Sequence, residues 1–310
     1  MTIELQPNHY GAWNNRSVVN ISLGRLDEAI ADSCRAVALN PKCESAWFNR
    51  GLAYEKKGLY QKAISDYSQG LQLEPTNSAG YNQRGIAFAN LGQWEKAAAD
   101  FTLAINNNPK HFIFWSNRGN AYLKLGRLDQ SISDLSQALI LNSKYAASWI
   151  NRGIAYTKKE LWKKAVYDYS QSLELEPNNP FVCNSLAWLL VTCPDLLVRD
   201  AGRAIALAEK AVSTESARGS YWNTLGVARY RAGDCLAACA DLEKSMERSN
   251  GGDSFDWFFL AMARWQLGDK DRARQLYDRA VEWMVKNHPT DKELLRFRTE
   301  AANLLEIEKK

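Results

Sequence analysis

Five arginines recur along the chain, and each one directly follows a carboxamide side chain. A guanidinium presents a planar fork of donors that fits a carboxylate, whereas a carboxamide offers one acceptor and a pair of donors. Two kinds of chemistry are therefore available, namely the binding of anionic groups and the binding of peptide backbone. The five dipeptides are Asn15-Arg16, Asn49-Arg50, Gln83-Arg84, Asn117-Arg118 and Asn151-Arg152, at intervals of 34 residues.

A fixed interval of this size indicates a repeat architecture. When the aromatic residue of each phrase is set at repeat position 4, small residues fall at positions 8 and 20, which lets two helices approach closely. Glycine at position 15 breaks a first helix in four units, and proline closes most units. The sequence predicts five helical hairpins, over 10–43, 44–77, 78–111, 112–145 and 146–179.

This pattern of Trp, Gly, Tyr, Ala and Pro resembles the tetratricopeptide repeat (TPR) family, and the resemblance covers nearly the whole chain. It implies an all-α fold, a right-handed α-solenoid of about eight hairpins. Three less regular units are expected at 180–218, with an extended turn, at 219–253 and at 254–289. The amphipathic stretch within 290–310 is expected to form a helix that caps the end of the stack.

Further expectations concern the two ends of the array. Residues 1–9 read as the remnant of a preceding repeat, because "TIELQPN" (2–8) is similar to "SLELEPN" (172–178). We expect the chain to be part of a longer protein; the alternative is that this segment covers the first repeat. The units after 180 resemble C-terminal modules of large bacterial TPR proteins, some of which carry a Ser/Thr kinase domain. No kinase motif occurs in this sequence.

Each of the five arginines has a matched aspartate 16 residues later, on the second helix of the same hairpin. The expected structural ion pairs are Arg16 with Asp32, Arg50 with Asp66, Arg84 with Asp100, Arg118 with Asp134, and Arg152 with Asp168. The alternative is a row of arginines for an anionic ligand. An unpaired buried charge is costly, so the pairs are the favoured interpretation.

The resemblance places a groove on the first helices, mainly at repeat positions 2, 5, 6, 9, 12 and 13, which we call the groove face. A row of carboxamides there resembles the asparagine ladder in the TPR superhelix of O-linked N-acetylglucosamine transferase, which binds peptide backbone. The alternative is that these amides cap local backbone or face solvent. The predicted peptide-binding residues are Asn15, Phe48, Asn49, Gln83, Asn117, Asn120, Lys124, Ile150, Asn151, Ile154, Lys158 and Trp188.

The predicted function is a scaffold that binds an extended, mildly acidic or apolar segment of another protein. Alternatives are self-association through the N-terminal edge, a regulatory region of a larger kinase-type protein, and RNA binding, which the net charge of +4 disfavours. No enzyme, cofactor or metal site is expected, because His9, His111 and His288 are scattered. Six cysteines without paired spacing, no signal pattern and no long apolar stretch predict a reduced, cytoplasmic protein without a membrane span.

Overall fold

The computed structural model describes residues 8–307, and every regular element in that range is helical. The expected remnant over 1–9 therefore lies almost wholly outside the described residues. The chain divides into two compact units, unit 1 with residues 1–159 and unit 2 with residues 160–310. The all-α fold predicted from the repeat pattern is confirmed.

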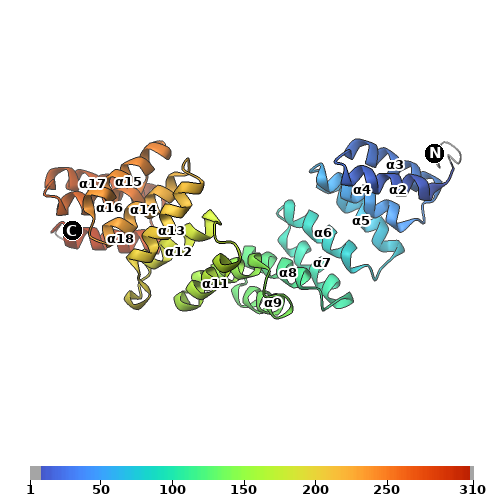
Figure 1. Cartoon of the computed structure of the whole chain (residues 1–310), viewed down its shortest axis with the longest axis horizontal. Coiled ribbons are helices and arrows are strands. Elements are labelled where there is room, and N and C mark those ends of the chain that lie inside the picture. The colour runs from blue at the N-terminus through green and yellow to red at the C-terminus, as the bar shows by residue number, and fades with distance from the viewer. Residues whose placement is uncertain (1–7, 308–310) are drawn as a thin grey trace. The chain divides into compact units, whose positions relative to one another are not determined.

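Unit 1 consists of helices that alternate between the first and second positions of a hairpin (Figure 1). Each first helix has 13 residues and each second helix has 14. The helices are α2 (Tyr10–Ser22), α3 (Leu26–Leu39), α4 (Glu44–Lys56), α5 (Tyr60–Leu73), α6 (Ser78–Asn90), α7 (Trp94–Asn107), α8 (Phe112–Lys124), α9 (Leu128–Leu141) and α10 (Ala146–Lys158).

Unit 2 continues the alternation but is less regular. A short 3₁₀ helix, η1 (Leu196–Val198), occupies the extended turn of the sixth repeat, and α17 is 18 residues long. The helices are α11 (Trp162–Leu175), α12 (Pro180–Thr192), α13 (Ala201–Thr214), α14 (Gly219–Arg231), α15 (Cys235–Arg248), α16 (Ser254–Gln266), α17 (Lys270–Asn287) and α18 (Lys292–Leu304).

The close approach of paired helices depends on the small residues at repeat position 8. A Cβ atom added at Gly51 would lie 2.7 Å from Cε1 of Tyr67, and one added at Gly85 would lie 2.7 Å from Cε1 of Phe101. Both aromatic rings are at most 2% exposed. The glycines are therefore required because a ring from the second helix lies directly on the backbone of the first.

The turn between the two helices of a hairpin needs one residue in the left-handed region. Gly92 has φ of 72°, and the corresponding residue of the fifth repeat is Glu160, with φ of 58°. Glycine adopts this conformation without steric cost, whereas a residue with a Cβ is strained there. The fifth repeat therefore keeps the left-handed turn although it has Glu160 in place of glycine.

None of the described helices is both long and apolar enough to cross a membrane.

Candidate binding groove

The arginine at repeat position 7 forms a two-pronged ion pair across the hairpin. In the second repeat, Nε of Arg50 lies 2.7 Å from Oδ2 of Asp66, and Nη2 lies 2.8 Å from Oδ1. Three further expected pairs have the same geometry: Asp32 accepts from Arg16, Asp100 accepts from Arg84, and Asp134 accepts from Arg118. Arg152 and Asp168 belong to different units, so that pair stays a prediction.

The aspartates of these pairs are core residues of the hairpins and do not lie on the groove face. Asp32 is 2% exposed, Asp66 and Asp100 are each 4% exposed, and Asp134 is 5% exposed. In the first repeat, Asp32 also accepts a hydrogen bond of 3.0 Å from Nδ2 of the buried Asn20. These four pairs thus join the two helices of a hairpin, and the carboxylates of Asp32, Asp66, Asp100 and Asp134 are engaged within it.

The remaining guanidinium nitrogen reaches the second helix of the preceding repeat. Nη1 of Arg84 donates to the Ser68 hydroxyl at 3.0 Å, and Nη1 of Arg118 donates to Thr102 at 3.0 Å. Arg152 bonds Ser136 at 2.9 Å in the same way. Each of these arginines therefore reaches a neighbouring repeat, and the polar residue at repeat position 25 is the partner that sequence reasoning missed.

Burial and charge both indicate a structural role for Arg50. The Arg50 side chain is 16% exposed. The hydrogen bond to Asp66 raises the pKa of Arg50 above its usual value, although burial acts in the opposite direction. The guanidinium also lies over the Trp47 ring, 4.8 Å from its centroid. Because its charge is matched internally, Arg50 is not available to an anionic ligand.

Two of the carboxamides at position 6 bond to asparagines at position 5 of the preceding repeat, and we call these bonds the amide network of unit 1. Nδ2 of Asn49 donates to Oδ1 of Asn14 at 2.8 Å, and Nδ2 of Asn117 donates to Oδ1 of Asn82 at 2.8 Å. Gln83 accepts a weaker bond of 3.4 Å from Asn82. Within unit 1 these bonds recur every second repeat, because among its five repeats position 5 is Asn only in the first and third.

The predicted groove residues of unit 1 all keep some solvent exposure, but they differ in their surroundings. Phe48 packs between α5 and α6, where a Cβ added at Gly70 or Gly80 would lie 2.8 Å and 2.6 Å from Cε1 of its ring. Phe48 thus fills the space between repeats as well as lining the face. Asn15, Lys124 and Lys158 are exposed, and the partly exposed residues are Asn49, Gln83, Asn117, Asn120, Ile150, Asn151 and Ile154.

The groove face of unit 2 is covered by α18. The Phe297 side chain is fully buried, with its ring centroid 4.8 Å from that of Phe259 and 6.0 Å from that of Trp188. Glu300 forms a two-pronged ion pair with Arg231 of α14. The sequence predicted a helix over the end of the stack, whereas α18 packs against the first helices of the sixth to eighth repeats.

The physical reason for this difference is the composition of the first helices in unit 2. Phe258 and Phe259 occupy positions 5 and 6 of the eighth repeat, and Trp188 occupies position 9 of the sixth, so this part of the groove face needs an apolar cover. The periodic leucines of the terminal helix showed that it was amphipathic, but they did not show which surface it covers. Trp188, a predicted groove residue, consequently lines a face that α18 partly occupies.

Asp241 of unit 2 forms an ion pair with an arginine that lies one helical turn after repeat position 7. Position 7 of the seventh repeat is Leu225, yet Asp241 occupies position 23. Nη1 of Arg229 lies 2.8 Å from Oδ2 of Asp241. Burial raises the pKa of Asp241 to about 6, and Arg229 offsets part of that rise. The signal was present in the sequence, because Arg229 follows Leu225 by four residues.

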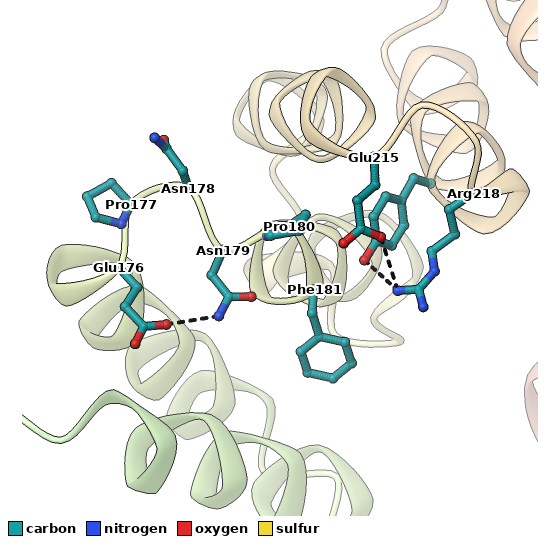
Figure 2. A pocket seen from close by; sticks show the side chains of 9 residues that line it. Glu176, Pro177, Asn178, Asn179, Pro180, Phe181, Glu215 and Arg218 are labelled. Atoms are coloured by element: carbon teal, nitrogen blue, oxygen red, sulfur yellow. Dashed lines mark hydrogen bonds and ion pairs between the residues drawn. The ribbon is translucent and has the colours of Figure 1, made fainter. Parts of the chain in front are cut away.

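A shallow pocket of 460 Å³ lies beside the loops that precede α12 and α14 (Figure 2). Its polar groups pair with one another. Asn179 donates to Glu176 at 2.9 Å, and Arg218 donates to the Tyr221 hydroxyl at 2.8 Å. Phe181 is 45% exposed at this site. The pocket therefore offers an apolar edge but little unused hydrogen-bonding capacity. Within residues 8–307, no cluster of His, Cys, Asp and Glu could hold a metal ion.

Stacked helical hairpins of two equal helices define an interaction scaffold of the α-solenoid class. Models of the tetratricopeptide repeat match residues 45–77, 113–145 and 146–179, a TPR repeat model matches 19–58, and another tetratricopeptide repeat model matches 257–283. The chain belongs to the tetratricopeptide repeat family, and its fold is that of a protein–protein interaction scaffold. No curated protein matches the chain.

Several solved structures share the fold at low sequence identity. YrrB, described as a TPR protein with an unusual peptide-binding site, is 20% identical with a TM-score of 0.53, over 59% of this chain and 94% of YrrB. A tetratricopeptide repeat protein from Parabacteroides merdae is 17% identical with a TM-score of 0.52, over 94% and 98% of the two chains. The Cut9-Hcn1 structure gives 20% identity and a TM-score of 0.59, over 73% of this chain and 44% of the matched chain.

Proposed function

We propose that the groove face of unit 1 binds an extended segment of another protein, chiefly through the side-chain amides of Asn49 and Asn117. An extended segment presents alternating backbone N–H and C=O groups, which need both an acceptor and a donor. Of the side chains on this face, the carboxamide alone supplies both in one rigid plane.

The observation that carries the proposal is the pairing of these amides with the preceding repeat. Each pair fixes the orientation of one carboxamide while using only one of its N–H groups. A carbonyl oxygen and a second N–H remain beyond that bond. Groups held in place before a ligand arrives lose less entropy on binding, so a fixed amide is a better contact than a freely rotating one.

The neighbouring residues favour a particular kind of segment. Ile150 and Ile154 lie one turn apart on α10 and are partly exposed, which suits apolar side chains of a ligand. Lys124 and Lys158 are exposed near the ends of their helices and favour acidic residues. YrrB is described as having a peptide-binding site, which supports this reading by analogy of fold.

All six cysteines carry free thiols, which supports a reducing, cytoplasmic setting.

The test is a selection of random peptides displayed on phage, followed by titration of the tightest peptide by fluorescence anisotropy. Three groove amides are removed together in Asn49→Ala/Asn117→Ala/Asn151→Ala, and we expect the Kd to rise at least about tenfold, because several hydrogen bonds are lost. Circular dichroism checks that the variant still folds.

The control variant, Gln69→Ala/Asn106→Ala/Gln130→Ala, removes three exposed amides from second helices. It should bind like the parent. If the groove variant also retained the parent affinity, the amides would not contact the peptide and the proposal would be wrong.

A further inference from the structure

A cavity of 340 Å³ lies in unit 2, between the first helices α12, α14 and α16 and the first turn of α18. One wall is aromatic, with Trp188 and Phe255 packed edge to face at a centroid distance of 5.9 Å. The other walls carry three carboxylates, from Asp253, Asp256 and Glu293. The volume suits a single long side chain rather than a folded element.

A buried acceptor in this cavity lacks a donor. Oδ1 of Asn184 is inaccessible to solvent and accepts no hydrogen bond within the described part of the chain. Asn14 and Asn82 occupy the same repeat position in unit 1, and each accepts from an asparagine of the next repeat. The corresponding residue here is Thr224, whose hydroxyl instead donates to the Ser220 carbonyl at 3.1 Å. A buried acceptor without a donor is uncommon and costly.

Two of the donors at the cavity are already engaged. Nδ2 of Asn223 donates to Oδ1 of Asp256 at 2.8 Å, and Nε1 of Trp188 donates to Oε2 of Glu293 at 3.3 Å. Among nearby cations, Arg296 lies 3.3 Å from Glu293. Three carboxylates thus face one guanidinium, which leaves an excess of negative charge.

Burial is the main cause of a raised pKa at two of these carboxyl groups. It raises the pKa of Asp256 to about 6, with hydrogen bonds from Ser245 and Asn223 acting in the opposite direction. It also raises the pKa of Glu293, which Arg296 partly offsets. A cation brought into the cavity would favour the ionised form of both groups.

We propose that this cavity binds the protonated side chain of a lysine or arginine from a partner protein. The aromatic wall contacts the cation and its aliphatic stem, the carboxylates balance the charge, and Asn184 accepts a hydrogen bond from it after a small side-chain rotation. The site lies in unit 2 and does not depend on the amide network of unit 1.

The indole N–H of Trp188 reports on the cavity directly, and its NMR signal is assigned by its loss in Trp188→Phe. The probes are three acetylated and amidated peptides, Gly-Gly-Xaa-Gly-Gly, in which Xaa is Lys, Arg or Gln. We expect a saturable shift of the Trp188 signal with the Lys or Arg peptide, in the millimolar range for so small a ligand, and no saturable shift with the Gln peptide.

Two variants of the parent chain test the assignment of the charge and of the acceptor. Glu293→Gln keeps an acceptor for Trp188 but removes a charge, and it should weaken binding about tenfold. Asn184→Leu should also weaken binding. If Glu293→Gln fails to fold, the affinity of Asn184→Leu tests whether the cavity binds the cationic side chain. The matched control Glu247→Gln removes an exposed charge from α15 and should bind like the parent. The proposal would be overturned by an equal response to the Gln peptide or by no response to either cationic peptide. It would also be overturned if Glu293→Gln, or Asn184→Leu where Glu293→Gln does not fold, bound the cationic peptides like the parent.

Discussion

The same helical hairpin produces two different groove faces in the two units. In unit 1, the first helices are held by arginine–aspartate pairs, and their amides remain at the surface. In unit 2, position 7 is leucine and α18 covers the face. Phe258, Phe259 and Met262 of α16 are fully buried. Arginine at position 7 thus occurs with a polar, open groove face, and leucine at position 7 occurs with an apolar, covered one.

Helix capping follows the same division. Five α-helices in unit 2 have an Asn or Asp side chain that accepts a backbone N–H at the N-terminus, at Asn179, Asp200, Asp234, Asp253 and Asp291. In unit 1 only His9 and Asn77 do so among the described helices. Unit 1 thus relies more on contacts between hairpins, whereas unit 2 combines local caps with a larger apolar core.

The largest effect is expected from Phe297→Ala, which tests the covered face of unit 2. Loss of this fully buried ring should destabilise unit 2 by about 3–5 kcal/mol, because the site cannot collapse around four helices. Hydrogen exchange should accelerate in α18 and in the exposed parts of α12, and unit 1 should be unchanged. The milder Phe297→Leu should cost less. Unaltered exchange in α18 would mean that Phe297 does not hold the helix.

The second effect tests the charged pairs of unit 1. Arg50→Leu leaves Asp66 buried without its partner and should destabilise unit 1 by about 3 kcal/mol, near the lower end for a broken buried pair, because the guanidinium keeps some solvent contact. Adding Asp66→Leu should recover much of the loss, since the sixth repeat already has Leu186 and Leu207 at these positions. Thermal unfolding measures both variants. A double variant no more stable than Arg50→Leu would contradict the pairing.

The smallest effect concerns Asp241, the aspartate of unit 2 whose partner lies one turn away. Its pKa in the folded state is about 6, against an ordinary value of 3.8. The folded state therefore binds this proton more tightly, and the resulting stability is full below about pH 4 and lost as the pH rises to about 6. Relative to the parent, Asp241→Asn should gain about 1–3 kcal/mol between pH 4 and pH 7.

Urea unfolding at a series of pH values measures this difference, with the exposed Asp278→Asn as a charge-matched variant. A difference between Asp241→Asn and the parent that does not change with pH would show that Asp241 is solvated in the folded protein.

Glycine and proline act locally, so the sequence alone indicates where a helix starts and ends. The first helices of the second, third and fourth repeats begin at Glu44, Ser78 and Phe112. The partners of Asn49 were not predicted, because Asn14 lies one repeat away and only stacking brings the two together. The position of α18 was not predicted either, since an amphipathic helix can cover any apolar surface of suitable width.

The sequence alone determined the all-α hairpin, the 34-residue period and the chemical matching of Arg50 with Asp66, because these depend on residues within one repeat. Tertiary structure alone decided which amides are held by a neighbour, where α18 packs and why Asn184 lacks a donor. Those features depend on contacts between repeats, and local propensity carries no information about such contacts.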